Sequence, residues 1–213
     1  MRLLITILLA LCLTAVSAQT KTQPSATEQK EKTLEGIAVG VDLVGPAMLC
    51  IGEYGDLQAT VTANLRGRYL PTVEVGYGKA DITDDDTDVR YKTSAPFFRL
   101  GCDFNLLKNK HDDYRLLVGL RYGFTSFSYD TYTPYDDGTS FTDESEKVSL
   151  HWLELCFGVD AKMWGPVHMG WSLRYRRRLN SPDYVNTPQY APGYGDASQG
   201  TRFMALYTVS VNF

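Results

Sequence analysis

Three residues that lie close together in the sequence could in principle form a catalytic set. Ser149, His151 and Glu154 supply a nucleophile, a base and a carboxylate, which are the groups that acyl transfer requires. However, Ser149 and His151 are only two positions apart on an expected strand, and none of the motifs that accompany such a set surrounds them. The sequence also lacks a glycine-rich phosphate loop and a metal-ligand spacing. We therefore expect no catalytic residues, no metal site and no cofactor.

A second group suited to chemistry consists of charged side chains at alternate positions of otherwise apolar segments. Such rows could carry protons or ions, or they could pair with one another inside the protein. We favour a structural charge network that leaves no open pore, because buried charges persist when they are paired and hydrogen-bonded. Pairing Lys162 with Pro166 would also place Glu154 opposite Arg174. The predicted network comprises Asp42, Glu74, Arg99, Asp103, Arg121, Glu154, Asp160, Lys162, Arg174 and Arg176.

Acidic, tyrosine-rich loops are the third candidate. Tyrosine is common in binding surfaces, but it also forms the aromatic girdle of membrane barrels. The carboxylates of residues 81–88 and 130–146 could hold a hard cation, or they could only keep exposed loops solvated. Trp152, Trp164 and Trp171 are candidates for the girdle or for a lipid-facing surface. The candidate loop binding residues are Tyr132, Tyr135, Tyr184, Tyr190 and Tyr194.

The chain that carries these residues divides into three predicted parts. Residues 1–18 have a basic start, an apolar run and small residues before Gln19, which predicts a cleaved signal peptide. Residues 19–35 are polar without an apolar period and are predicted to be a flexible periplasmic linker. Residues 36–213 form one domain. Its odd number of cysteines indicates no disulfide framework, and a net charge of −4 argues against a nucleic-acid partner.

Side chains that alternate between apolar and polar dominate residues 36–213 and predict an all-β fold. In the last segment, for example, Tyr207, Val209 and Val211 alternate with Thr208 and Ser210. Most of the predicted strands exceed the ~5–6 residues that are common in soluble sheets, and a tilted strand needs ~9–11 to cross a bilayer. A break in phase near residues 152–153 indicates either a bulge or the exit of the strand from a membrane. The eight strands are expected at residues 36–44, 57–66, 70–79, 94–107, 113–129, 147–162, 166–178 and 201–213.

The connections between these strands alternate between long and short. Such alternation, together with an even number of strands, is typical of outer-membrane barrels, which have short turns inside and long loops outside. The short connections are residues 67–69, 108–112 and 163–165, and the long ones are residues 45–56, 80–93, 130–146 and 179–200.

Three features predict that the apolar face points toward lipid. The polar face is rich in glycine, which a solvated surface would not favour but a crowded interior would. Its charges are mainly arginine and carboxylate, with little lysine. The chain also ends on Phe213, after Tyr207, Val209 and Val211 at alternate positions, and this ending predicts a C-terminal assembly signal. The polar-face glycines are Gly40, Gly76, Gly78, Gly101, Gly119, Gly123, Gly158 and Gly170.

The chain therefore resembles the small outer-membrane β-barrel proteins of the Bacteroidota, which include families of unknown function. The resemblance rests on the Ala18-Gln19 junction, the strand rhythm of residues 36–213 and the Phe213 ending. It implies a closed antiparallel eight-stranded transmembrane barrel in a bacterial outer membrane. The implied partners are membrane lipid and the barrel-assembly machinery.

Three classes of function follow from these patterns. The first is a non-enzymatic outer-membrane protein with a structural role, or with loops that bind a surface glycan, lipopolysaccharide or a protein. The second is an outer-membrane enzyme that modifies lipid. The third is a soluble carrier like the lipocalins, which would have the same strand period with its apolar face inside.

Overall fold

The computed structural model describes residues 33–84, 88–107, 113–134, 140–142, 146–180 and 188–213. The predicted signal peptide and most of the predicted linker lie outside these ranges. Within them, no helix combines the length and the apolar character that would let it cross a membrane.

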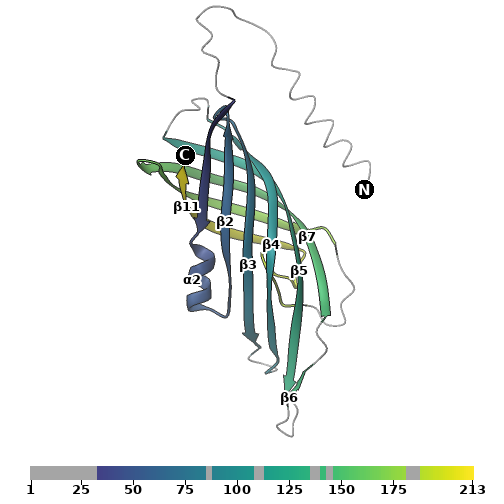
Figure 1. Ribbon diagram of the computed structural model, residues 1–213. Helices are drawn as coiled ribbons and strands as arrows, with labels where there is room; N and C mark the ends of the chain where they lie inside the picture. Colours follow the sequence, from purple (N-terminus) through teal and green to yellow (C-terminus); the bar gives the residue numbers. More distant parts are fainter. Residues whose placement is uncertain (1–32, 85–87, 108–112, 135–139, 143–145, 181–187) are drawn as a thin grey trace, which may run out of the picture. The chain divides into compact units, whose positions relative to one another are not determined.

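Eight antiparallel strands form a closed barrel (Figure 1). Each strand pairs with the next, and the last pairs back with the first through Ala38–Asn212 to Asp42–Thr208. This confirms the predicted fold class, and every predicted strand overlaps an observed one. The barrel strands are β1 (Leu34–Asp42), β2 (Tyr54–Leu65), β3 (Tyr69–Thr83), β4 (Arg90–Asn105), β5 (Tyr114–Pro134), β7 (Glu146–Trp164), β8 (Val167–Arg178) and β11 (Thr201–Asn212).

Four shorter elements lie in the connections. The helix α2 (Val44–Ile51) follows β1, and β6 (Ser140–Thr142) pairs with the end of β5. The two-residue strands β9 (Tyr190–Ala191) and β10 (Gly195–Asp196) form a small hairpin between β8 and β11. These elements are too short to show a periodic pattern, which is why the sequence did not reveal them.

The two ends of the barrel differ in the length of their connections. At one end, which we call the turn end, residues 66–68 and 165–166 join neighbouring strands. At the other, the loop end, residues 43–53 and 179–200 make long connections. Tight reversal at the turn end is helped by Gly67 and Gly165, whose φ angles are +61° and +53°. The predicted alternation of short and long connections is therefore found for these residues.

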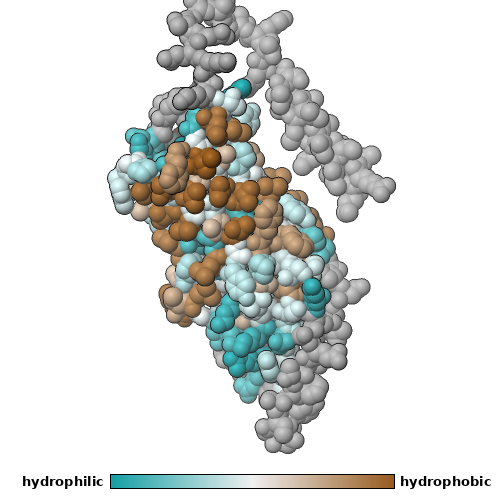
Figure 2. Space-filling model, viewed as in Figure 1, coloured by the Kyte–Doolittle hydropathy of each residue, from teal (hydrophilic) through white to brown (hydrophobic). Residues whose placement is uncertain are grey.

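The side chains of the barrel have the reverse of the polarity found in a soluble protein. Phe157 and Leu155 point outward and are about half exposed, at 49% and 54%. Glu74, Arg99 and Glu154 point inward and are fully buried. Figure 2 shows apolar side chains gathered over the wall of the barrel toward the turn end. Burial of the charged rows and exposure of the apolar rows confirm the predicted direction of the two faces.

This polarity reverses again where the strands approach the loop end. Along the outer face of β3, Val75 and Tyr77 are followed by Lys79 and Asp81, and Figure 2 shows polar side chains in this region. The inner face becomes apolar at the same level, since Phe97 lies next to Arg99 along the inward row of β4. An apolar inside and a polar outside suit strands that are surrounded by water. The reversal therefore marks the level at which the apolar outer band ends. The buried apolar cluster contains Ala80, Tyr91, Ala95, Phe97, Phe127, Tyr129, Val148, Leu150, Trp152, Tyr190, Ala191, Tyr194 and Ala197.

Trp152 lies inside this cluster and has no exposed surface. The prediction that it belongs to a girdle or a lipid face is therefore wrong, whereas Trp164 and Trp171 are both exposed. The pairing of β7 is regular on both sides of Trp152, so no bulge occurs there. Of the two interpretations of the phase break, the structure fits the exit from the apolar band.

Glycine makes room for large inward side chains, as predicted. A Cβ atom on Gly123 would lie 2.1 Å from the Trp152 ring, and one on Gly119 would lie 1.8 Å from Asp103 Oδ1. Such distances are far below van der Waals contact, so a larger residue would displace the ring or the carboxylate. Glycine at these positions therefore leaves space for the neighbouring side chains, and its backbone flexibility is not what is needed there.

Candidate functional site: the barrel interior

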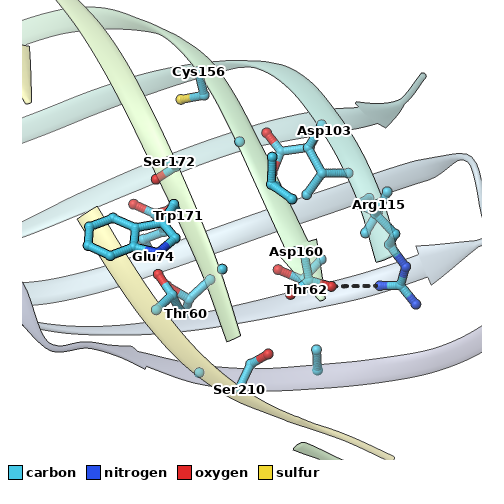
Figure 3. A pocket seen from close by; sticks show the side chains of 18 of the residues that line it. Thr60, Thr62, Glu74, Asp103, Arg115, Cys156, Asp160, Trp171, Ser172 and Ser210 are labelled. Carbon is cyan, nitrogen blue, oxygen red and sulfur yellow. Dashed lines mark ion pairs between the residues drawn. The ribbon is translucent and has the colours of Figure 1, made fainter. Parts of the chain in front are cut away.

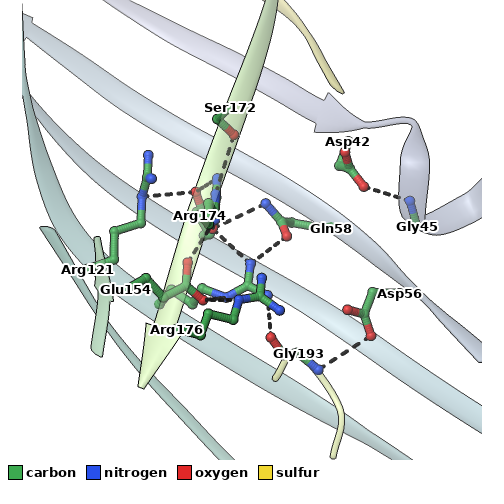
Figure 4. A network of polar contacts seen from close by, with 12 residues as sticks. Asp42, Gly45, Asp56, Gln58, Arg121, Glu154, Ser172, Arg174, Arg176 and Gly193 are labelled. Atoms are coloured by element: carbon green, nitrogen blue, oxygen red, sulfur yellow. Dashed lines mark hydrogen bonds and ion pairs between the residues drawn. The ribbon is translucent and has the colours of Figure 1, made fainter. Parts of the chain in front are cut away.

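A cluster of buried charges occupies the middle of the barrel (Figure 4). Glu74 of β3 accepts hydrogen bonds from Arg174 Nη1 and Nη2, both at 2.8 Å, and from Arg99 Nη1 at 2.9 Å. Arg121 Nε lies 3.1 Å from Glu74, and Arg121 Nη2 donates to Asp103 at 2.7 Å. Strands β3, β4, β5 and β8 thus converge on one carboxylate from across the interior.

Glu154 is the second centre of this cluster. Its carboxylate lies 2.8 Å from Arg176 Nε and 3.0 Å from Arg99 Nε, and it accepts a 3.2 Å hydrogen bond from Arg174 Nη1. The indole of Trp152 also donates to Glu154 at 2.7 Å. Buried charges persist only when they are paired and hydrogen-bonded, and both carboxylates meet this condition. The cluster thus has the contacts of a structural network.

The predicted register of the β7–β8 hairpin is wrong by two residues. Glu154 is opposite Arg176, and Lys162 is opposite His168. The chain turns at Gly165 and Pro166, and the register shifts between Lys162 and Trp164, so the hairpin contains an irregularity that the sequence did not reveal. Arg174 still reaches Glu154 because a long side chain can span a diagonal position on the same face.

The remaining members of the predicted network are not in the central cluster. Asp42 is buried beside α2, where its carboxylate accepts from the backbone N–H groups of Gly45 and Tyr207 at 2.7 and 3.2 Å. Asp160 lies near the turn end and is 2.9 Å from His168 Nδ1. Lys162 belongs to the inward row of β7 but lies at the turn end, where its side chain is exposed and 3.8 Å from Asp113, so it does not join the central cluster.

The β9–β10 hairpin closes the loop end of the interior. Arg99 Nη2 donates to Gly193 O at 2.6 Å, and Arg176 Nη1 donates to Tyr194 O at 2.9 Å. Tyr190 donates its hydroxyl to Asp56 at 2.6 Å. We refer to residues 188–197 as the plug. The plug contacts the central charge cluster and contributes residues to the buried apolar cluster. The charge cluster and the apolar cluster therefore form two successive layers that obstruct the lumen.

The plug corrects one prediction about the loops. Tyr190 and Tyr194 are buried, at 3% and 0% exposure, so they are not part of an exposed binding surface. Tyr132, at the loop end of β5, is partly exposed. Tyr135 and Tyr184 lie outside the described residues. The only hint of the plug in the sequence is the run Ala191-Pro192-Gly193-Tyr194-Gly195, which combines turn residues with an aromatic ring.

Two further interior residues were missed by sequence analysis. Gln58 donates to Glu74 at 3.2 Å and accepts from Arg99 at 2.5 Å, so it links the two. Asp56 holds the Tyr190 hydroxyl. Both lie on the inward face of β2. The predicted strand at residues 57–66 includes Gln58 but places Asp56 in the preceding connection, and nothing local distinguishes either residue from other polar residues.

A cavity of about 110 Å³, lined by both polar and apolar residues, lies between the charge cluster and the turn end (Figure 3). Its lining includes the hydroxyl groups of Thr60, Thr62, Ser172 and Ser210. The space beside these hydroxyl groups has room for a few water molecules, since one occupies ~30 Å³ in the liquid. Among the described residues, no group of three or more His, Cys, Asp or Glu side chains could hold a metal ion.

The possible catalytic set is not assembled. His151 and Ser149 belong to the outward row of β7, where Tyr122 OH is 2.5 Å from His151 Nδ1 and Ser149 donates to Ser126. Glu154 lies on the opposite, inward face and is fully occupied by arginines. These three residues therefore cannot act together.

The C-terminal residues complete the barrel wall. Tyr207, Val209 and Val211 belong to the outward row of β11, and Phe213 is 79% exposed. Phe213 N donates to Ile37 O at 2.9 Å, and Ile37 N donates to Phe213 O at 3.1 Å. The last residue thus fixes the seam between β1 and β11. Its recognition as an assembly signal stays a prediction.

The closure by the plug should weaken in alkali. Burial, with Asp56 nearby, holds the pKa of Tyr190 far above its usual value of 10. The folded state therefore favours the neutral phenol, and the stability it contributes is present below about pH 10 and decreases as the pH rises above it. We expect protease cleavage within residues 188–197 to accelerate above pH 10. The Tyr190→Phe variant should show less of this acceleration, and equal acceleration would contradict the assignment.

One solved structure supports this fold. The structure is similar to that of a major outer membrane protein from Thermus thermophilus, with a TM-score of 0.53 and 13% identity over 84% of this chain and 98% of that chain. Neisserial surface protein A (NspA) matches with a TM-score of 0.38 and 11% identity, over 84% of this chain and 96% of that chain. A search of curated proteins gave no match. The family described as "Domain of unknown function (DUF6048)" matches residues 1–213, and the chain therefore belongs to this family.

Proposed function

We propose that this protein is a non-enzymatic barrel of a bacterial outer membrane, with a closed lumen and with a structural or surface-binding role at its loop end. The observation that carries the proposal is the reversed polarity of the wall. Rows of half-exposed side chains such as Val73, Leu100 and Phe157 surround buried Glu74 and Glu154. Apolar rows of this extent would be costly in water, whereas acyl chains would accommodate them.

The loop end is the part that would meet a partner. Beyond the apolar band, the outer faces carry charges of both signs, including Lys79, Asp81, Arg90 and Lys92. Arg90 and Asp81 form a bidentate ion pair at 2.6 and 2.8 Å, which lowers the pKa of Asp81. A surface glycan, lipopolysaccharide or a protein would contact this surface together with Tyr132. The proposal includes cleavage after residue 18, recognition of Phe213 by the barrel-assembly machinery and a Bacteroidota origin, all of which stay predictions.

Membrane fractionation tests the location directly. We expect the protein in the outer-membrane fraction after carbonate extraction, and we expect its folded form to migrate differently from heated protein on gels. A soluble carrier would appear in the carbonate supernatant. Recovery there would contradict the proposal.

The closed lumen predicts an absence of steady conductance. Arg99 and Arg176 connect the central charges to the plug, and both side chains are fully buried. Purified protein in planar bilayers should give no stable current steps at any moderate voltage. As a control, deletion of residues 188–197 removes the plug and its part of the apolar cluster, and it retains every residue of the central charge cluster. Steady conductance of the unaltered chain would contradict a closed lumen.

A further inference from the structure

One part of the barrel wall is not closed by strand pairing. The pairing of β1 with β11 ends at Asp42–Thr208, and the pairing of β1 with β2 ends at Val41–Ala59. Toward the loop end, residues 54–58 of β2 and 201–207 of β11 continue, and each pairs on its other edge with β3 or β8. No described residue pairs these two segments with each other. The wall therefore has a gap between β2 and β11.

The helix α2 covers this gap (Figure 1). It packs closely on β2, where a Cβ atom on Gly55 would lie 2.7 Å from Leu49 Cγ. Toward β11, a hydrogen bond from Leu43 N to Tyr207 O, at 2.9 Å, fixes its start. None of its residues, VGPAMLCI, has a charged side chain, and Ile51 is 88% exposed. A helix that is apolar all round suits apolar surroundings and not water.

Hollows lie on both sides of this helix. Outside, an apolar groove of about 510 Å³ runs between α2 and the barrel, with Trp171 and Tyr207 among its lining residues. Inside the gap, a pocket of about 190 Å³ lies between β2, β11 and the plug. Val44, Met48 and Tyr54 line both hollows. Only α2 and the start of β2 therefore separate the groove from the pocket.

The inner pocket lies along the edge of β11 and not on one of its faces. Four consecutive residues of this strand, 202–205, line it. Because consecutive side chains of a strand point to opposite faces, a space that all four residues line runs along the edge of the strand, where the backbone of each residue is accessible. The outward Phe203 and Ala205 and the inward Met204 therefore meet the same space. The inner pocket therefore lies at the boundary between the outer surface of the barrel and its interior, behind α2.

We propose that the gap between β2 and β11 is a lateral binding site for one acyl chain of a lipid from the surrounding leaflet. The inference rests on the proposed membrane location, because the outer groove is continuous with the apolar band through Trp171 and Tyr207. Arg202 also lines the inner pocket, but its charge is paired with Asp196 at 2.8 Å, and the carboxylates of Asp42 and Asp56 there disfavour an anionic headgroup. Both already accept hydrogen bonds from protein donors. The hydrocarbon tail therefore enters the gap, and the headgroup stays outside.

Photolabelling with a lipid tests this site. The full-length protein is reconstituted in phosphatidylcholine vesicles that contain a phosphatidylcholine with a diazirine at the end of one acyl chain. After irradiation, labelled residues are mapped by mass spectrometry. We expect labels on Met204 and Tyr190, which face the interior, in addition to outward residues such as Leu155. Labels confined to outward residues would overturn the inference.

A matched pair of variants adds a second readout. Ala205→Trp places a large ring in the gap, and we expect the labels on Met204 and Tyr190 to be lost. Ala161→Trp makes the same change on the outer face of β7, at the turn end, and should leave those labels unchanged. Equal labelling of the interior in both variants would overturn the inference. Protein that fails to float with the vesicles would instead overturn the proposed membrane location, and the inference with it.

Discussion

Glu74→Gln is expected to lower the free energy of unfolding by about 3–5 kcal/mol, the cost typical of removing one partner from a buried ion pair. Three arginines, Arg99, Arg121 and Arg174, contact this carboxylate in the interior. The glutamine has nearly the same shape, so the change removes charge and leaves little cavity. The three guanidinium groups would then have only the carboxylates of Glu154 and Asp103 to balance their positive charges. Urea titration of protein folded in vesicles, followed by the gel mobility of unheated samples, measures the effect.

Glu53→Gln is the matched control for this prediction. Glu53 is exposed in the connection between α2 and β2, so the same change of side chain should leave the urea midpoint unchanged. Equal midpoints for the two variants would mean that Glu74 is solvated. The network of interior ion pairs would then not be a source of stability.

Leu155→Arg is expected to destabilise the folded barrel by about 2–4 kcal/mol if the residue lies near the middle of the bilayer, the cost known for arginine on a lipid-facing surface. Leu155 is 54% exposed on the outer face of β7, between Leu120 and Tyr175 on the neighbouring strands. In a water-soluble barrel, an arginine at so exposed a position would change the stability little. The same urea titration distinguishes these outcomes.

Ser149→Arg provides the comparison within the same strand. Ser149 belongs to the same outward row but lies beyond the level at which the wall becomes polar. We expect no loss of stability, because an arginine at this level meets water. A similar loss for both variants would contradict the position of the boundary, and no loss for either would contradict the lipid-facing wall.

The barrel could be predicted from the sequence because its determinants are periodic. Alternation at period two gives the strands and separates the faces, and it correctly placed Arg121 and Glu154 inside and Phe157 outside. The glycines of the inner rows follow from the same logic, as the contact of Gly123 with Trp152 shows. Each of these features is supported by many residues with the same alternation, so one residue that departs from the pattern does not change the prediction.

What could not be predicted depends on single turns and on distant contacts. The β7–β8 register shifts because of one irregularity beside Trp164, and no pattern in the sequence marks it. The plug depends on backbone carbonyls such as Gly193 O that accept from Arg99, a residue 94 positions away. Side-chain identity does not encode such carbonyl contacts. Tyr190 and Tyr194 were consequently assigned to the surface.

The gap covered by α2 has a similar origin. It arises because β1 ends at Asp42, whereas its neighbours β2 and β11 extend further. Strand ends are the least certain feature of a periodic pattern. The predicted strand at residues 36–44 already included Leu43 and Val44, which in the structure lead into the helix. The predicted strand is two residues longer than β1, and this small difference is why the gap between β2 and β11 could not be predicted from the sequence.

Tryptophan fluorescence in vesicles with brominated acyl chains tests the reversed polarity most directly. Two single-tryptophan variants are compared, one that retains Trp171 on the outer face and one that retains Trp152 in the interior. We predict strong quenching of Trp171 by the brominated chains and little quenching of Trp152. Quenching of Trp152 by the lipid, with Trp171 accessible to iodide in the water, would contradict a wall whose apolar rows face acyl chains.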